Sequence, residues 1–495
     1  MKNYGLILFC FLFFSLVYIH QRNFDGPTSV SRLDLLHAIV GRGTVCIDAY
    51  HHNTTDKAMW EGHYYSDKAP GTVVLALPAF LIARLILFIL GISLDSGIGW
   101  LVSSWIACAG SIALIASAGG VACYYWLRQH VPAQAAITTT LAVYLGGMPL
   151  PYSTMMFSHA LVVGLLSGAL WAVDGPREFP DQRQWDLLGG FCSGWALACE
   201  YTAGLVIVGL LVWLYFRSRK RALLFAAAML PALLLIPAYS WLCFSKPFIL
   251  PYSLQASFPT MRDGLYAIRW PSARTAANLL FMPTRGLFFW SPFLLLAGLA
   301  FFELLRKSRL YLFLVILVPL IQVTVISGRG WDWQAGPAMG PRYLSPILPL
   351  LALPCAMSVL KYRSVALYWA GYAIAITVLA TITDATPPGR IWNPLFDLNV
   401  ADLLRGRYSH SIGAALGLPQ WLSMLLYGTF LVFGMIWLYR NASDAGKELE
   451  TGALWRVTAN VSNSSLHGPA LISATSRTPE ATALERSTDS PGRFS

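Results

Sequence analysis

The segment from residue 20 to residue 71 concentrates side chains that can transfer protons and hold phosphate groups. Its densest part reads IDAYHHNTTDKAMWEGHYYSDKAPG and ends in Pro70 and Gly71, where a long apolar run begins. Acids and histidines alternate there with tyrosine and tryptophan, whose rings favour the boundary between membrane and water. We therefore predict an active-site loop at a membrane surface. A solvated loop anchored by its aromatic rings is the alternative.

A metal site within this segment is a further possibility. His51, His52 and neighbouring aspartates carry ligand atoms that divalent metals accept. Adjacent histidines are, however, poor co-ligands on regular structure. A divalent metal is therefore the one cofactor that the sequence leaves open.

The stretch SGRGWDWQAGPAMGPRYLSPILPLLALP, residues 327–354, is a second group of candidates. Its glycines let the backbone approach a ligand closely. Arg342 stands at the head of a predicted helix, where its planar fork of donors suits a phosphate. Trp331 and Asp332 form a pair suited to stacking on a sugar. An interfacial re-entrant turn capped by Arg342 is the alternative interpretation.

Three more residues are scattered along the chain. Glu200 lies within an apolar run, where a bare carboxylate is costly and marks a functional position. Pairing with a neighbouring helix would explain it equally well. His159 and Arg285 each stand at a predicted helix end, where a side chain can bind substrate or merely cap the helix and extend toward water.

The elements that must position these residues are membrane helices. The chain has 495 residues, of which 56% are hydrophobic and 12% charged, and this excludes a soluble globular protein. We predict an all-α polytopic membrane protein with about twelve transmembrane helices and a long first outer loop, at 4–19, 72–92, 98–126, 133–150, 157–173, 187–215, 222–244, 286–304, 310–327, 343–360, 364–382 and 422–439.

The net charge of +11 comes largely from short basic clusters between apolar runs. Such clusters mark the cytoplasmic side and argue against a nucleic-acid partner. The clusters at 217–221, 306–309 and 361–363 fall on one side in a count of twelve helices. We therefore expect a multi-pass protein of the bacterial inner membrane with both termini cytoplasmic. The side of residues 151–159 stays open, because one wrongly divided helix would move them across.

Two features outside the helices complete the organisation. Residues 441–495 are rich in Ser, Thr, Ala and Gly, so we predict a disordered cytoplasmic tail behind a transmembrane domain at 1–440. The eight cysteines form no CxxC pair, so neither a disulfide framework nor a zinc site is indicated. Most of these cysteines are expected to be small packing residues.

The chain resembles the GT-C membrane glycosyltransferases that use polyprenyl-phosphate sugars, especially relatives of the protein O-mannosyltransferases and the lipid A aminoarabinose transferase. The resemblance covers residues 1–440 and depends on YYSDKAPG, PYSTMMFSHA, TRGLFFWSPF and GPRYLSPILP. It implies transfer of a sugar from a lipid phosphate to an acceptor hydroxyl at the outer leaflet, usually with inversion. The implied partners are a polyprenyl-phosphate-linked sugar, the lipid bilayer and a glycan, lipid or protein acceptor.

The resemblance also implies roles for individual residues. Lys68, at the end of the first loop, would contact the lipid phosphate together with Arg342. The family's acid after the first helix has no counterpart in residues 27–32, so we expect the catalytic base to be Asp48 or, second, Asp56. The remaining candidates for substrate binding are His63, Tyr65, Asp67, His159, Arg285, Trp331 and Asp332.

Two other functions remain compatible with the sequence. A lipid-sugar flippase or transporter would use a similar membrane body, although related halves are expected of transporters and the halves of this chain differ. A non-catalytic protein that binds a lipid-linked sugar would explain the missing acid.

Overall fold

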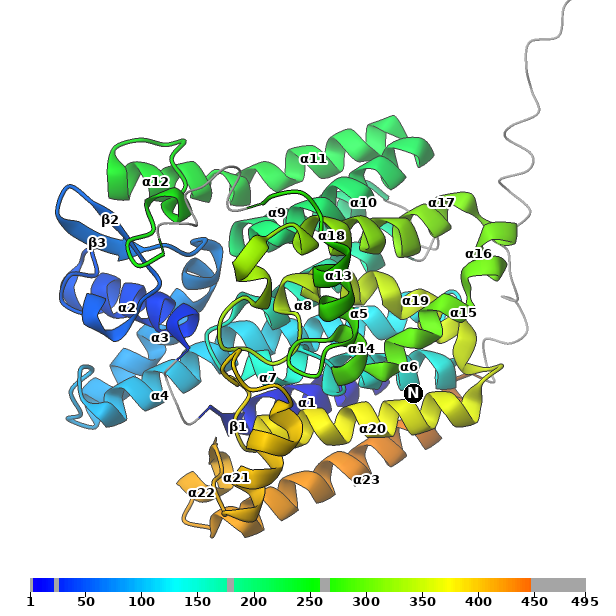
Figure 1. The fold of residues 1–495 in the computed structure, drawn as a ribbon. Coiled ribbons are helices and arrows are strands. Elements are labelled where there is room, and N and C mark those ends of the chain that lie inside the picture. Colours follow the sequence, from blue (N-terminus) through cyan, green and yellow to red (C-terminus); the bar gives the residue numbers. More distant parts are fainter. Residues whose placement is uncertain (1–2, 22–25, 176–181, 259–267, 447–495) are drawn as a thin grey trace, which may run out of the picture. The chain divides into compact units, whose positions relative to one another are not determined.

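The computed structural model describes residues 3–21, 26–175, 182–258 and 268–446, except for the side chains of residues 307, 331 and 443–446. Asp25 and the predicted tail beyond residue 446 lie outside the described residues. The described chain is mostly helical (Figure 1). Seven of its helical segments are long and apolar enough to cross a membrane: Gly71–Ile89, Gly97–Arg128, Arg219–Phe244, Arg309–Ser327, Arg342–Val359, Arg363–Ile382 and Gln420–Ala442. The prediction of an all-α polytopic chain is confirmed.

The helices follow one another with short connections, and several predicted spans consist of two or three consecutive pieces. The α-helices are α1 Tyr4–Val17, α2 Pro27–Arg42, α3 Gly71–Ile89, α4 Gly97–Ala107, α5 Leu114–Arg128, α6 Ala133–Leu145, α7 Pro149–Ser153, α8 Ser158–Asp174, α9 Gln182–Cys199, α10 Gly204–Arg217, α11 Arg219–Leu233, α12 Leu235–Phe244, α13 Ala273–Phe281, α14 Leu287–Trp290, α15 Leu296–Leu299, α16 Phe301–Lys307, α17 Arg309–Leu312, α18 Val318–Ser327, α19 Leu348–Val359, α20 Arg363–Ile382, α21 Ala401–Leu404, α22 Ile412–Ala415 and α23 Gln420–Gly446.

The strands are short and serve to fasten connections. The two pairs are β1 Ile19–His20 with β4 His410–Ser411, and β2 Lys57–Trp60 with β3 His63–Ser66, both antiparallel. The first pair joins the exit of α1 to the connection before α23. The second is a hairpin whose turn places Glu61 and Gly62 at φ 50° and 85°. Gly62 adopts this left-handed conformation without steric cost.

The long helices run between two ends of a bundle. We call one the first-loop end, because it carries residues 18–21 and 26–70, and the other the basic end. At the basic end Asp174 accepts hydrogen bonds from Trp126 (3.0 Å), Arg217 (2.8 Å) and Tyr311 (2.7 Å). This buried carboxylate therefore ties together α5, α8, α10 and α17.

Hydrogen bonds at the first-loop end mark the opposite helix termini. Trp105 Nε1 donates to the carbonyl of Val17 at 2.9 Å, and Ser153 Oγ donates to the carbonyl of Leu16 at 3.1 Å. The exit of α1 thus lies beside residue 105 and beside α7.

The predicted span at 72–92 is present as the apolar helix α3, but the contacts of α3 place both of its ends near the first-loop end. Gly71 packs so closely on Ala198 that an added Cβ would lie 2.6 Å from its carbonyl carbon. After α3, Asp95 accepts a hydrogen bond of 2.9 Å from Tyr50, which belongs to the first connection. Figure 1 shows α3 beside α2, with α4 next to α3. Hydropathy counts apolar side chains and does not distinguish a crossing helix from one that returns.

The prediction of a single helix at 187–215 is wrong, because the run is divided into two helices. Glu200 has an extended backbone (φ −155°, ψ 113°) that separates α9 from α10. Arg221 forms an ion pair of 2.8 Å with Asp186, so the start of α9 lies with the start of α11 at the basic end. The chain therefore enters and leaves the bundle again within this run, and Glu200 stands at its turn rather than inside a helix.

The path of α3 removes one predicted crossing of the bundle, and the turn at Glu200 adds one. Connections after α10 therefore lie at the ends that the sequence predicted, whereas connections between α3 and Glu200 lie at the opposite ends. Residues 146–157 lie at the first-loop end, as the contact of Ser153 with α1 requires, whereas His130 lies at the basic end, 3.0 Å from Asp174. The position of residues 151–159, which the sequence left open, is thereby decided in favour of the first-loop end.

The first connection contains a helix that the sequence analysis missed. Pro27 occupies the first turn of α2, and Gly43 ends it in the left-handed conformation with φ 67°. Both residues are typical of these positions, since proline lacks the N–H group that is unpaired there and glycine tolerates positive φ. Ser31, Arg32 and Asp34 of α2 are buried, so the helix places charged groups inside the protein.

Candidate active site

Lys68 lies between the buried carboxylate of Asp67 and the half-buried carboxylate of Asp56. Its ammonium nitrogen is 2.7 Å from Asp56 Oδ2 and 3.2 Å from Asp67 Oδ1. Burial alone would lower the pKa of Lys68, but the two neighbouring carboxylates raise it above its usual value. The lysine is therefore a fixed positive charge at the exit of β3, immediately before α3.

The two carboxylates differ because their surroundings differ. Burial opposes ionisation of Asp56, yet Lys68 and the hydroxyl of Thr28 together hold its pKa below the usual value. Burial raises the pKa of Asp67 to about 6, against the opposing effect of Lys68. The cluster thus contains one carboxylate that is ionised throughout the neutral range and one that titrates just below it.

Arg342 joins this cluster from a distant part of the sequence. It opens the short 3₁₀ helix Arg342–Ile347, which continues into α19. Its Nη1 donates to Thr28 Oγ1 at 3.2 Å, and Thr28 in turn donates to Asp56 at 2.7 Å. Arg342 is 6% exposed, so a second cation is enclosed beside Lys68.

Arg32 of α2 supplies a third buried cation. It donates to the carbonyl of Met156 at 3.1 Å and to Ser158 Oγ at 3.2 Å. Ser158 donates to Glu200 Oε2 at 2.8 Å, and His159 Nδ1 lies 3.9 Å from the same oxygen. The turn between α9 and α10 therefore brings a carboxylate to the start of α8.

These groups surround a small cavity at the first-loop end. Its volume is about 30 Å³, which is room for water but not for a sugar phosphate. Binding of a larger ligand therefore requires the cavity to open. The lining residues are Thr28, Arg32, Lys68, Ala69, His159, Cys199, Glu200, Tyr201, Tyr252, Arg342 and Tyr343.

Aromatic side chains cover the cations of the cavity. Lys68 Nζ lies 5.0 Å from the centre of the Tyr252 ring, and the Arg342 guanidinium lies 4.8 Å from the centre of the Phe157 ring. Such contacts stabilise a cation away from water. Tyr343 lines the cavity with one face and donates to Asp332 at 3.1 Å. The predicted residue Asp332 thus stands behind the lining and is paired with Arg329.

The structure brings several of the predicted residues together. Lys68, Asp56, Asp67 and Arg342 form one cluster, and His159 lines the same cavity. Asp56 and Asp67 contact Lys68 without belonging to the lining. The cluster joins the end of the first connection to the segment before α19.

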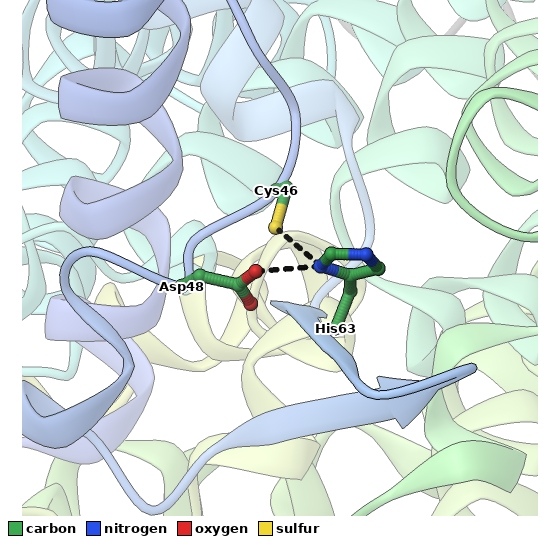
Figure 2. Close-up of side chains that lie close together, drawn as sticks. All are labelled: Cys46, Asp48 and His63. Carbon is green, nitrogen blue, oxygen red and sulfur yellow. Dashed lines mark hydrogen bonds and ion pairs between the residues drawn. The ribbon is translucent and has the colours of Figure 1, made fainter.

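Asp48, His63 and Tyr65 lie elsewhere, in an open surface hollow of about 340 Å³ that shares no lining residue with the cavity. His63 Nδ1 is 2.7 Å from Asp48 Oδ2 and 3.9 Å from Cys46 Sγ (Figure 2). The hollow is larger than the cavity, but its charged groups are exposed. We regard the cavity as the candidate active site, because only there are several cations buried together.

Arg285 does not line the described cavity. Arg285 is buried and donates to the carbonyls of Gln334 (3.0 Å), Gly336 (2.8 Å) and Pro387 (3.1 Å). It therefore fastens the connection before Arg342 to the connection after α20. The side chain of Trp331 lies outside the described residues.

Sequence reasoning missed Arg32, Thr28 and the three tyrosines of the cavity, Tyr201, Tyr252 and Tyr343. A signal for Arg32 was present, since PTSVSRLDLLHAIVGR begins with a proline suited to a helix start and carries an arginine and an aspartate among apolar residues. Tyr252 and Tyr343 gave no such signal. Tyr252 belongs to the connection after α12 and Tyr343 to the segment before α19, and both line the cavity because these two segments pack against the first connection.

No protein-family model matches the chain, and no curated protein matches it. Solved structures do. ArnT from Cupriavidus metallidurans, bound to undecaprenyl phosphate, is similar with 16% identity and a TM-score of 0.46, over 90% of this chain and 78% of that chain.

Two further solved structures are similar over shorter parts of their own length. The Archaeoglobus fulgidus oligosaccharyltransferase has 13% identity and a TM-score of 0.38, over 83% of this chain and 57% of that chain. The arabinosyltransferase EmbB from Mycobacterium smegmatis has 12% identity and a TM-score of 0.38, over 92% of this chain and 43% of that chain. At these values the likeness says nothing about substrate or reaction, which have to be inferred from the cavity.

Proposed function

We propose that this protein is a membrane glycosyltransferase of the GT-C type that transfers a sugar from a polyprenyl phosphate to an acceptor hydroxyl. The observation that carries the proposal is the enclosure of Lys68, Arg342 and Arg32 around one cavity at the end of an apolar helix bundle. Fixed cations beside a cavity suit a negatively charged group such as a phosphate, and Asp56 and Asp67 hold one of these cations, Lys68, in place. A lipid phosphate has this charge and reaches this depth.

Lys68 and Arg342 would hold the phosphate. As the bond between sugar and phosphate oxygen breaks, negative charge grows on the leaving phosphate, and fixed cations stabilise it more than they stabilise the intact donor. Asp56 holds Lys68 at 2.7 Å and orients it toward the cavity. Thr28 links Asp56 to Arg342, so the two cations share one hydrogen-bonded support.

The acceptor hydroxyl needs a base, and Glu200 is our first choice. Its carboxylate lines the cavity and its side chain is 15% exposed, whereas Asp56 supports Lys68 from outside the lining. Ser158 and Thr202 donate to Glu200 at 2.8 and 3.3 Å and fix its orientation. Removal of the acceptor proton by Glu200, with direct attack on the sugar carbon, would invert the configuration at that carbon. Asp56 is the second choice as base, and Asp48 lies apart in the surface hollow.

The charge pattern supports an orientation in the bacterial inner membrane. The basic clusters at 217–221 and 306–309 would face the cytoplasm, together with both termini. The cavity would then face the outer leaflet. The acceptor would be a glycan, lipid or protein of the envelope.

The test is transfer by the purified full-length protein from synthetic polyprenyl-phosphate sugars, with donor binding measured separately. A general base contributes about 10²–10⁴-fold to rate, so Glu200→Gln should lose turnover by that factor and keep donor binding. Lys68→Ala should weaken donor binding, and Asp56→Asn should do so as well if it only supports Lys68. Glu61→Gln, a change in the exposed hairpin turn, is the matched control and should behave as wild type.

Each other outcome has a definite meaning. If Asp56→Asn instead loses turnover with intact donor binding, Asp56 is the base. If wild type binds the donor but transfers no sugar with any acceptor, the protein is a binding protein. Movement of a lipid-linked sugar across vesicles without transfer would identify a flippase, and wild-type donor binding in Lys68→Ala would overturn the phosphate site.

A further inference from the structure

The hollow beside the β2–β3 hairpin contains three different metal-ligand atoms that meet at one point. They are Cys46 Sγ, Asp48 Oδ2 and His63 Nδ1, and a ligand atom from each residue lies within 4.8 Å of the other two. Cys46 and Asp48 come from the segment that follows α2, and His63 is the first residue of β3 (Figure 2). The cluster therefore joins two pieces of the first connection. It lies apart from the candidate active site.

The geometry favours a metal over a nucleophile. In a cysteine–histidine–aspartate nucleophile, the thiol and the carboxylate contact different nitrogens of the imidazole, so that a proton can pass between them. Here Asp48 and Cys46 both approach Nδ1, at 2.7 Å and 3.9 Å. Three ligand atoms that converge on one point leave no path for proton relay. Three ligand atoms this close together can take up one face of a tetrahedron around a cation.

The surrounding structure holds the carboxylate in place. The second oxygen of Asp48 accepts a hydrogen bond of 2.6 Å from the backbone N–H of Tyr64. The N–H of Ile47 donates to the carbonyl of Tyr64 at 2.8 Å. Ligand carboxylates in metal sites are commonly oriented by such outer contacts. The segment that carries Cys46 and Asp48 is thus already paired with β3.

We propose that Cys46, Asp48 and His63 bind one zinc-type divalent ion, with water in the fourth position. A thiolate, an imidazole and a carboxylate are the ligands that Zn²⁺ accepts, whereas Mg²⁺ and Ca²⁺ prefer oxygen ligands alone. The open hollow of about 340 Å³ leaves room for the water. Binding replaces the thiol proton of Cys46, so affinity rises with pH. The sequence analysis found no zinc site because it searched for paired cysteines.

The ion would have a structural consequence for the hairpin. His63 opens β3, which ends at Ser66 immediately before Asp67 and Lys68. A metal that fastens β3 to residues 46–48 would stabilise the strand leading to Lys68. This proposal stands independently of the proposed reaction.

The experiment uses the full-length protein, kept reduced, freed of metal with a chelator and titrated with Co²⁺ alone. We expect one Co²⁺ per chain, with the near-ultraviolet band of a cobalt–thiolate bond, and displacement of the band by Zn²⁺. Cys46→Ser should lose the band. Loss of an outer-shell partner costs about 10–100-fold in metal affinity, so His63→Ala and Asp48→Asn should weaken binding by at least about tenfold.

Two variants provide controls, because Cys10 is an exposed cysteine outside the cluster and His52, like His63, is an exposed histidine of the first connection. Cys10→Ser and His52→Ala should keep the band and the affinity. Zn²⁺ should also raise the unfolding temperature of wild type but not of His63→Ala, since a ligand stabilises the state it binds. Persistence of the band in Cys46→Ser, or Co²⁺ binding without a thiolate band in wild type, would overturn the site.

Discussion

At the scale of single residues, the molecule encloses more charge than a packed helical protein usually tolerates. Lys68, Asp56 and Asp67 neutralise one another at distances of 2.7 and 3.2 Å. Removal of one partner from such a group leaves an uncompensated charge and costs about 3–5 kcal/mol. Activity measurements on Lys68→Ala therefore need a parallel measurement of stability.

Asp34 provides a prediction on pH dependence. Its carboxyl is fully buried and accepts a hydrogen bond of 3.1 Å from Asn53, and burial raises its pKa from 3.8 to about 7. Between these values the folded protein holds a proton that the unfolded chain has lost, so stability falls as pH rises through this window. One pKa unit corresponds to about 1.4 kcal/mol.

Asp34→Asn removes this titration, because the amide stays neutral. We expect the variant to unfold at a higher temperature than wild type at pH 8, with the difference shrinking as pH is lowered toward 4. Thermal unfolding in one detergent at several pH values measures it. Asp397→Asn, at an exposed carboxylate, should leave the pH profile unchanged. A difference independent of pH would contradict the assignment.

At the scale of elements, the positions of the site residues depend on where helices stop. The extended residue Glu200 divides an apolar run into α9 and α10 and so turns a carboxylate toward Ser158. Gly43 stops α2, and the chain can then return through the hairpin to Lys68. The extended backbone at Glu200 and the left-handed backbone at Gly43 therefore allow Glu200 and Lys68 to lie at the cavity.

Close contact between α5 and α8 gives a prediction on packing. A Cβ added to Gly119 would lie 2.2 Å from the Cα of Gly164, which is backbone and cannot move aside cheaply. Gly119→Ala should therefore destabilise the protein by about 1–3 kcal/mol. Gly371→Ala is the control, because no atom lies within 4 Å of the added Cβ. Thermal unfolding of both variants decides the matter, and equal stability would show that α5 and α8 separate easily.

At the scale of the whole molecule, contacts assign each described connection to one end of the bundle. Tyr239 donates to the carbonyl of Ser66 at 3.0 Å, and Gln21 donates to the carbonyl of Thr381 at 3.1 Å. The ends of α12 and α20 therefore lie with the first connection. The opposite end contains Asp174 and its partners.

This arrangement predicts which residues a reagent can reach from each side of the membrane. Ser93, after α3, should lie on the same side as Glu61 of the hairpin and opposite Lys220, and all three are exposed. A membrane-impermeant thiol reagent, applied to cells, should label Ser93→Cys and Glu61→Cys but not Lys220→Cys. The background replaces Cys10 and Cys46 by serine, since both can react. If Ser93→Cys follows Lys220→Cys, α3 crosses the membrane and the described path is wrong.

The sequence alone determined the properties that depend on composition and short spacing. Apolar runs predicted helices, because only a helix satisfies its own backbone in lipid. The residue pattern of YYSDKAPG and GPRYLSPILP singled out Lys68 and Arg342, which the structure brings together through Thr28.

Only the tertiary structure decided which residues share the cavity and at which end each connection lies. An apolar run has the same hydropathy whether it crosses once, as predicted for 187–215, or turns back at Glu200. The sequence placed Asp48 before Asp56 as the candidate base on the same loop, yet Asp48 contacts His63 on the surface and Asp56 contacts Lys68 beside the cavity. These differences arise from contacts between residues far apart in the chain, and spacing along the sequence does not encode such distances.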